Sequence, residues 1–200
     1  HHKTVRRQRQ MCIRDRLLVG LGNPTPNSNN NRHNIGFKVV DAINQKFGLS
    51  KQKPKFKGLL TTGNIGEQKV YAIKPLTFMN NSGICIRELL EYFKMDAEDV
   101  IVFHDDLDVE FGKIKAKFGG SSAGHNGIAS IDKFIGKDYS RVRIGIGKPD
   151  KKISVSDFVL NDFTDDEQEH LEKITSNIIE SLSILIDKKL DLFSSTVNNN

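Results

Sequence analysis

Leu17-Leu18-Val19-Gly20-Leu21 is a short apolar run closed by Gly22-Asn23-Pro24, and it predicts a buried first strand. After the next loop, Arg32-His33-Asn34-Ile35-Gly36 opens a stretch whose apolar residues recur at helical spacing as far as Gly48. A histidine at such a helix start, after a strand and a Gly/Pro turn, can face an open cleft. Because imidazole titrates near neutral pH, His33 is a candidate for proton transfer.

Strand-like and helix-like segments alternate along the rest of the chain. We expect strands at Gly58–Thr62, Lys69–Ile73, Asp99–Phe103, Gly112–Phe118 and Arg141–Gly145, helices at Ser82–Lys94 (capped by Ser82), Gly124–Phe134 and Asp166–Leu190, and a loop at Lys51–Lys55. This alternation predicts an α/β fold in which one mixed β-sheet is flanked by helices on both faces. Residues 16–197 would form this single domain.

Charge is distributed unevenly along the chain. Residues 1–16 hold six basic residues and one acid, residues 17–160 hold 21 and 15, and residues 161–200 hold 3 and 9. A basic body with an acidic tail fits contact with a polyanion through one face. Residues 1–15 resemble nothing downstream and lack the apolar stretch of a secretory signal, so we expect them to be a disordered or non-native extension.

Other bulk properties restrict the location of the protein. No apolar run reaches the roughly 18 to 20 residues of a membrane-spanning helix. The two cysteines, Cys12 and Cys85, form neither a disulfide framework nor a paired metal-ligand spacing. We therefore expect a cytoplasmic protein without a membrane span.

Two cofactor hypotheses find little support in the motifs. Gly20-Leu21-Gly22 follows a strand, as in dinucleotide-binding folds, but position 25 is Thr and the neighbouring prolines prevent a helix from opening there. His33, His104, His125 and the nearby aspartates lack the spacing of a metal site, although separate loops could still converge on a metal. We expect no cofactor and no metal.

A hydrolytic site is the alternative that the polar clusters favour. A carboxylate such as Asp105 could accept the N–H of His33, which fixes the tautomer of the ring and stabilises the imidazolium that forms when water is deprotonated. No nucleophilic serine elbow is present, so water is the better nucleophile. Asn23, Asn80 and Asn126, each in a turn beside or near a glycine, offer uncharged donors for a carbonyl oxygen or a water.

Basic residues also gather on one expected strand. Lys113, Lys115 and Lys117 alternate, so their side chains share a face. Together with Arg141 and Arg143 they could contact phosphates and position an RNA. An ordinary solvated face is the alternative.

Five motifs together resemble the bacterial-type peptidyl-tRNA hydrolase family. They are Gly-Leu-Gly-Asn-Pro from Gly20, Arg-His-Asn-Ile-Gly from Arg32, Phe-Met-Asn-Asn-Ser-Gly from Phe78, His-Asp-Asp-Leu-Asp from His104 and Gly-His-Asn-Gly from Gly124. The resemblance extends from Arg16 to Val197. It implies a monomeric, metal-free α/β enzyme that hydrolyses the ester between a peptide and the 3′-terminal adenosine of tRNA, which recycles tRNA for translation.

The resemblance also implies roles for single residues. The family's catalytic histidine falls on His33 and its partner aspartate on Asp105. The substrate-positioning residues are Asn23, Met79, Asn80, His125 and Asn126, and Lys115, Lys117 and Arg143 match positions on the tRNA side.

The chain departs from the family pattern in two loops. Thr25, Ser28 and Asn31 replace the usual Gly, Tyr and Thr, and the missing Tyr removes an aromatic wall from the cleft mouth. Val109-Glu110-Phe111 replaces a Pro-rich turn. Two other functions remain open: an RNA-binding protein on this fold that has lost catalysis, and an esterase without RNA preference.

Overall fold

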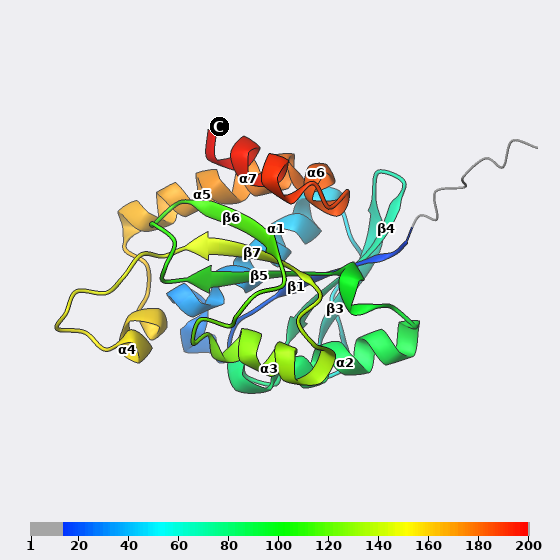
Figure 1. The fold of residues 1–200 in the computed structure, drawn as a ribbon, viewed down its shortest axis with the longest axis horizontal. Helices are drawn as coiled ribbons and strands as arrows, with labels where there is room; N and C mark the ends of the chain where they lie inside the picture. Colours follow the sequence, from blue (N-terminus) through cyan, green and yellow to red (C-terminus); the bar gives the residue numbers. More distant parts are fainter. Residues whose placement is uncertain (1–13, 200) are drawn as a thin grey trace, which may run out of the picture.

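Seven strands pair into one mixed sheet in the computed structural model, which describes residues 14–199 (Figure 1). In spatial order the strands are β2 (Lys53–Lys55), β3 (Gly58–Ile65), β4 (Gln68–Pro75), β1 (Arg16–Gly20), β5 (Val100–Asp106), β7 (Ser140–Gly145) and β6 (Ile114–Phe118). The central strands β4, β1, β5 and β7 are parallel, and the outer strands pair antiparallel. The expected α/β fold with a mixed sheet is confirmed.

Helices cover both faces of this sheet, as the alternating sequence predicts. They are α1 (Ile35–Phe47), α2 (Ser82–Phe93), α3 (Asn126–Ile135), α4 (Val155–Leu160), α5 (Asp165–Glu180), α6 (Leu182–Ile186) and α7 (Leu190–Asn199), with single 3₁₀ turns η1 (Pro26–Ser28), η2 (Arg32–Asn34), η3 (Met79–Asn81) and η4 (Ala97–Asp99). Figure 1 shows α2 and α3 along one side of the sheet, α5 to α7 along the other, and α4 standing apart on a loop. Within residues 14–199, no helix is both long and apolar enough to cross a membrane.

The central strand β1 is buried on both faces, which explains why it is an uninterrupted apolar run. Leu18 packs with α1 and the C-terminal helices, whereas Leu17 and Val19 pack with α2 and α3. Parallel strands that are covered by helices on both sides have this composition. The prediction of a buried first strand is therefore confirmed.

The parallel strands bring distant loops together at one edge of the sheet. The carboxyl ends of β1, β4 and β5 are neighbours, so the chain that follows each strand emerges at the same edge. Asn23 follows β1, Phe78–Asn80 follows β4, and His104 and Asp105 lie near the carboxyl end of β5. In open α/β sheets, this edge is where ligands bind.

Two glycines let α1 lie directly on the sheet next to this edge. A Cβ at Gly20 would lie 2.3 Å from the Gly36 carbonyl oxygen, and a Cβ at Gly36 would lie 2.4 Å from both the Leu21 nitrogen and the Phe103 oxygen. These neighbours are backbone atoms, which cannot move aside cheaply. The close approach sets the position of the first turn of α1, and therefore of His33 just before it.

Gly36→Ala is expected to destabilise the fold by about 1 to 3 kcal/mol, or more, because its methyl group overlaps backbone atoms of Leu21 and Phe103. Each kcal/mol should lower the melting temperature by roughly 2 to 4 °C for a chain of this size. The matched control is Gly63→Ala, whose Cβ would meet mainly the flexible tip of Leu49. Thermal unfolding followed by circular dichroism measures both variants, and equal melting temperatures for the two would contradict the close-contact argument.

Several local predictions are wrong. Residues 53–55 form the edge strand β2 rather than a loop, and β3 and β4 extend further than expected, to a turn at Gly66. Ser82 is not a cap, because it is the first residue of α2 and its hydroxyl donates to the Met79 carbonyl oxygen at 3.0 Å. The expected extension at residues 1–15 falls mostly on residues outside the described part.

The C-terminal half differs most from the expectation. The helix predicted over 166–190 ends at Glu180, and α6 and α7 follow as separate helices. Ser181 is buried at this break with φ −94° and ψ 4°, and Lys188 with φ +61° ends the turn after α6. The apolar spacing continues through the break, since Leu182 and Leu185 also pack into the core, so periodicity alone could not locate it. The short helices α4 and α7 were not predicted.

Candidate active site

A cavity of about 750 Å³ opens at the carboxyl edge of the sheet. It is lined by residues of six separate segments: Asn23; His33; Phe78, Met79 and Asn80; Asp105, Asp106, Leu107 and Asp108; Ser122, Ala123, Gly124, His125 and Asn126; and Val155, Ser156, Val159 and Leu160 of α4. All seven residues predicted as catalytic or substrate-binding therefore line one cavity. The sequence separates them by up to 103 positions, from Asn23 to Asn126.

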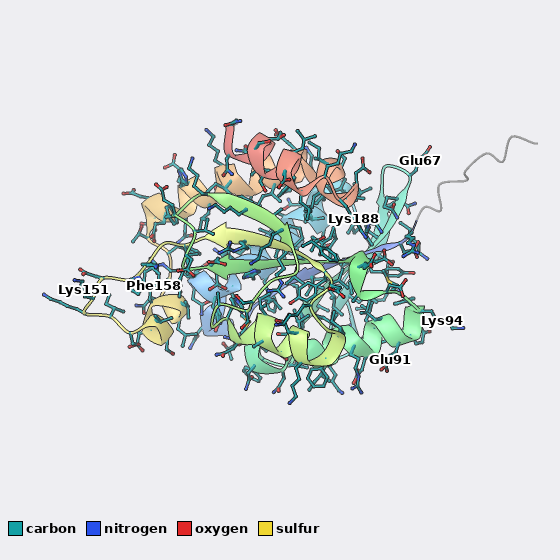
Figure 2. All side chains as sticks on the ribbon, viewed as in Figure 1. Glu67, Glu91, Lys94, Lys151, Phe158 and Lys188 are labelled. Atoms are coloured by element: carbon teal, nitrogen blue, oxygen red, sulfur yellow. The ribbon has the colours of Figure 1, made fainter. Side chains whose placement is uncertain are left out.

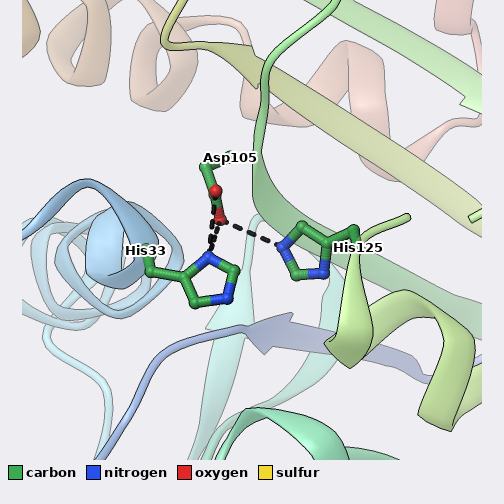
Figure 3. A group of neighbouring side chains, drawn as sticks. All are labelled: His33, Asp105 and His125. Carbon is green, nitrogen blue, oxygen red and sulfur yellow. Dashed lines mark hydrogen bonds and ion pairs between the residues drawn. The ribbon is translucent and has the colours of Figure 1, made fainter. Parts of the chain in front are cut away.

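His33 and Asp105 are directly paired at the base of this cavity (Figure 3). The Nδ1 atom of His33 lies 2.9 Å from each carboxylate oxygen of Asp105. Because a carboxylate only accepts hydrogen bonds, Nδ1 carries the proton and the lone pair is on Nε2. In residues 14–199, Nε2 makes no hydrogen bond, so it is available to take a proton from a molecule in the cavity.

His125 binds the same carboxylate from the other side. Its Nε2 donates to Asp105 Oδ1 at 3.0 Å, while its Nδ1 accepts from the backbone N–H groups of Gly127 and Ile128 at 3.1 and 3.3 Å. His125 is thus the N-cap of α3, and this cap fixes its tautomer with the proton on Nε2. A ring whose Nδ1 is held in this way adds a second hydrogen-bond donor to Asp105.

Asp105 remains an anion in this buried position. Burial alone would raise the pKa of its carboxyl, but the hydrogen bonds and charges of His125 and His33 hold that pKa well below the ordinary range. The side chain is 2 % exposed, so the two imidazoles rather than water stabilise the charge. This carboxylate can stabilise an imidazolium at His33 during proton transfer.

The asparagine after β1 is held rigidly. Asn23 and Asn34 bond each other twice, from the Asn23 N–H to Asn34 Oδ1 at 2.8 Å and from Asn34 Nδ2 to the Asn23 carbonyl oxygen at 2.9 Å. The Asn23 Oδ1 accepts from the Met79 N–H at 2.9 Å, and the NH₂ group of Asn23 has no hydrogen-bond partner within residues 14–199. Asn80 and Asn126 are exposed at the rim of the cavity.

Comparison with known proteins agrees with this arrangement. Residues 17–200 match the sequence model of the family described as peptidyl-tRNA hydrolase. The chain belongs to the peptidyl-tRNA hydrolase family.

Curated relatives and solved structures cover nearly the whole chain. A peptidyl-tRNA hydrolase of Pelagibacter ubique is 82 % identical over 92 % of this chain and 98 % of its own length. One of Gluconobacter oxydans is 43 % identical over 91 % of this chain and 97 % of its own length. The crystal structure of peptidyl-tRNA hydrolase from Acinetobacter baumannii is similar with a TM-score of 0.86 and 34 % identity, covering 92 % of this chain and 94 % of that chain.

A third histidine lies behind the pair in this peptidyl-tRNA hydrolase family member. His104 is 3 % exposed, its Nδ1 donates to the Asp105 carbonyl oxygen at 2.7 Å, and its ring meets that of His125 edge-on at 4.9 Å. Burial, followed by the charge of His125, lowers the pKa of His104 to about 3. His104 is therefore neutral near pH 7 and serves as a packing support for His125.

Acid is expected to destabilise the fold through His104. In the unfolded chain a histidine binds a proton near pH 6.5, whereas the folded His104 does so only near pH 3. The stabilisation by neutral His104 is thus complete above pH 6.5 and is lost as the pH falls toward 3, by up to about 1.4 kcal/mol per pH unit. Urea unfolding of His104→Asn should show a difference between pH 7 and pH 5 that is smaller than in the unchanged chain by up to about 2 kcal/mol. An unchanged difference would show that His104 does not titrate in this way.

Four basic residues of β6 and β7 share one face of the sheet, but they differ in how far they are exposed. Lys115 lies opposite Arg143, and Lys117 lies opposite Arg141, so all four are on one face of the sheet. Arg143 is half-buried and pairs with Asp106 at 2.6 Å. Burial, and then the charges of Arg143 and Arg141, lower the pKa of Lys117, which shows that positive charge is concentrated there.

Arg141 does not belong to an accessible basic surface. It is 1 % exposed and donates to Asp132 at 2.7 Å and to the Ser121 carbonyl oxygen at 2.8 Å. The prediction that Arg141 could contact phosphates is wrong, because a buried guanidinium cannot reach them. Its role is to tie the glycine-rich loop and α3 to β7.

One group in the described part of the chain could supply metal ligands. His33, Asp105 and His125 each offer an atom within 4.8 Å of the others. The ring nitrogens concerned, His33 Nδ1 and His125 Nε2, both point at the Asp105 carboxylate at hydrogen-bond distance. A cation would need these nitrogens as lone-pair donors, whereas the α3 cap keeps the proton on His125 Nε2. The arrangement fits a hydrogen-bonded triad better than a metal site.

The two loops that depart from the family pattern are held in place by burial and by local hydrogen bonds. Ser28 is buried, bonds the Thr25 hydroxyl, and its N–H donates to the Thr25 carbonyl oxygen at 3.0 Å. Val109 is 2 % exposed and accepts from the Gly147 N–H at 3.1 Å. Within residues 14–199, neither loop makes a hydrogen bond to the side chain of His33 or Asp105.

Several residues of the site were not predicted from the sequence. The residues of α4 belong to a short helix with exposed apolar side chains inside a polar stretch, which carries no clear periodic signal. Asn34 could have been found, because it directly follows His33 in a motif and asparagine side chains commonly bond backbone groups nearby.

Proposed function

We propose that this protein hydrolyses the ester between the peptide and the 3′-terminal adenosine of peptidyl-tRNA. One observation carries the proposal: a His33–Asp105 pair with a free Nε2 lies in a cavity large enough for a peptide ester end. Membership of the peptidyl-tRNA hydrolase family supports this substrate. The intact pair argues against the alternative in which the chain only binds RNA.

The reaction begins with a water molecule beside His33. Nε2 of His33 removes a proton as the water oxygen attacks the ester carbonyl carbon, and Asp105 stabilises the imidazolium. The tetrahedral intermediate then collapses, the bond to the ribose oxygen breaks, and the proton on Nε2 passes to that oxygen. The products are the peptide with a free carboxyl group and tRNA with a free hydroxyl group.

Uncharged amides hold the reacting end in this proposal. Because Asn23 Oδ1 accepts from the Met79 N–H, the amide of Asn23 is fixed in orientation, and its NH₂ group donates to the carbonyl oxygen as that oxygen becomes an oxyanion. Asn80 and Asn126 hold the peptide and the terminal nucleotide at the rim, with Met79 and His125 as walls. Removing one oxyanion donor typically costs about 10²- to 10³-fold in turnover.

The tRNA body extends over the basic face in this proposal. Lys115, Lys117 and Arg143 contact phosphates there and contribute affinity without reading sequence. We expect the protein to act as a monomer in the cytoplasm. An esterase without RNA preference would not depend on these residues.

The test compares three esters with the purified protein, in the presence of a chelator. The substrates are an N-acetylaminoacyl-tRNA, the same tRNA with an unblocked amino acid, and a small N-acetyl amino acid methyl ester. We expect rapid cleavage of the first only, with kcat/KM falling steeply as salt is added, because phosphate contacts release counterions. Cleavage of the methyl ester at a similar rate would favour a general esterase, and binding of tRNA without cleavage would favour the RNA-binding alternative.

A further inference from the structure

Arg32, the residue directly before His33, is a buried cation that the proposed reaction does not use. It is 7 % exposed. Its Nη1 donates to the carbonyl oxygens of Asn161 and Asp162 at 3.2 and 2.7 Å, the two residues that directly follow α4. The guanidinium therefore holds the carboxyl end of α4 next to the segment that carries the base.

The other side of the guanidinium binds the start of α5. Nη2 pairs with Glu167 Oε2 at 2.7 Å, and the same oxygen accepts from the Thr164 N–H at 2.8 Å in the capping box of α5. The planar group also lies over the rings of Phe158 and Phe163, at 4.5 and 5.2 Å from their centroids. Such a planar, multidentate site suits arginine and not lysine.

The backbone hydrogen bonds between the segment around Arg32 and the segment around α4 involve only residues of the latter that follow α4. The Arg32 N–H donates to the Asn161 carbonyl oxygen at 3.1 Å, and the Phe163 N–H donates to the Asn30 carbonyl oxygen at 3.1 Å. Phe158 is the side chain of α4 that Arg32 contacts. In Figure 2, Phe158 lies on the inner side of the loop that carries α4, whereas Lys151 extends from its outer tip.

Other side chains of α4 form an apolar wall of the cavity. Val155 and Leu160 line the cavity although they are 54 % and 48 % exposed, and Val159 lies beneath them. Phe78, which is 52 % exposed, lines the same cavity from the segment after β4. Large apolar side chains left in water around a cavity are typical of a surface that a ligand covers.

We propose that Arg32 is a positioning residue that holds the α4 wall beside His33, and that this wall binds apolar side chains of the peptide. The inference rests on the proposed function, because it assigns the peptide part of the same substrate to a surface. Through Phe158 and the two carbonyl oxygens, Arg32 fixes the distance between the base and the peptide. Acting through α4, it affects binding of the peptide more than the chemical step.

The test separates peptide binding from chemistry with two substrates on one tRNA. One carries N-acetylglycine and the other an N-acetylated tripeptide of leucines. In Arg32→Gln we expect KM for the leucine substrate to rise about tenfold, the loss expected when a binding surface is no longer preorganised, with kcat within about twofold. KM for the glycine substrate should change by less than about twofold. Amide hydrogen exchange in residues 155–162 should become faster, which requires no activity.

Two further variants control for general destabilisation. Arg16→Gln removes another ion pair that is largely shielded from solvent, Arg16 to Asp99 at 2.8 Å, far from α4, and should change KM for both substrates equally or not at all. Phe158→Leu removes the ring beneath the guanidinium and should reproduce the selective rise in KM even if Arg32→Gln does not fold. Equal losses for both substrates in Arg32→Gln and Phe158→Leu, or unchanged exchange in α4, would overturn the inference while cleavage by the unchanged chain leaves the proposed function intact. Cleavage of neither substrate by the unchanged chain would overturn both.

Discussion

His33→Ala is expected to lower turnover on an N-acetylaminoacyl-tRNA by at least about 10²- to 10⁴-fold, the range that a positioned proton-transfer group contributes. The substitution removes Nε2, which is the free basic atom facing the cavity, and leaves the carboxylate of Asp105 bonded to His125. Affinity for tRNA should change little, because the basic face on β6 and β7 is untouched. Initial rates at saturating substrate and filter binding of uncharged tRNA measure the two quantities.

The matched control is His170→Ala, which removes an exposed histidine on α5 outside the cavity. Its turnover should stay within about twofold of that of the unchanged chain, as is usual for surface substitutions. If His33→Ala retained full turnover, His33 would not be the base.

Asp105→Asn is expected to reduce turnover by about 10⁴-fold, although it changes the volume of the side chain very little. Both carboxylate oxygens lie 2.9 Å from His33 Nδ1, and Oδ1 also accepts from His125, so an asparagine places its NH₂ group against His33 Nδ1 in either orientation of the amide. His33 would then adopt the other tautomer, with the proton on the atom that should accept one. In serine hydrolases, the same substitution of an orienting aspartate has an effect of this size.

Asp132→Asn provides the comparison for Asp105→Asn. Asp132 accepts from Arg141 at 2.7 Å and from Tyr139 at 2.7 Å, outside the cavity, so the change should lower stability without a specific loss of turnover. Asp132→Asn should therefore have the lower melting temperature, and Asp105→Asn should have the slower single-turnover rate. A loss of turnover in Asp105→Asn that only matched its loss of stability would argue against an orienting role.

The part of the fold around β1 could be predicted because local signals agree there. An apolar run, a Gly/Pro turn and a helix with a glycine stop at Gly48 all indicate the same elements, and Gly48 does adopt the left-handed conformation with φ +59°. The break at Ser181 could not be predicted, because both sides of it bury apolar residues at helical spacing. The break lets α7 pack against β6, a tertiary contact that leaves no local signal in the sequence.

The sequence predicts which residues gather in the cavity, but not all of the hydrogen bonds between them. His33 and Asp105 are 72 positions apart, and the motifs alone could not show that His125 would bond the same carboxylate and cap α3 at once. The contacts of Arg32 could not be predicted either, because its carbonyl partners follow a short helix that has no clear signal in the sequence. These contacts arise from tertiary packing, which no local pattern encodes.

The most direct measurement is a single-turnover time course with the protein in excess over a labelled N-acetylaminoacyl-tRNA. It is run for the unchanged chain and for His33→Ala, with tRNA affinity measured in parallel. We predict rapid release of free tRNA by the first, release at least about 10²-fold slower by the second, and equal affinity for both. Equal rates for the two proteins, or bound tRNA that neither protein cleaves, would contradict the assignment of the His33–Asp105 pair as the catalytic group.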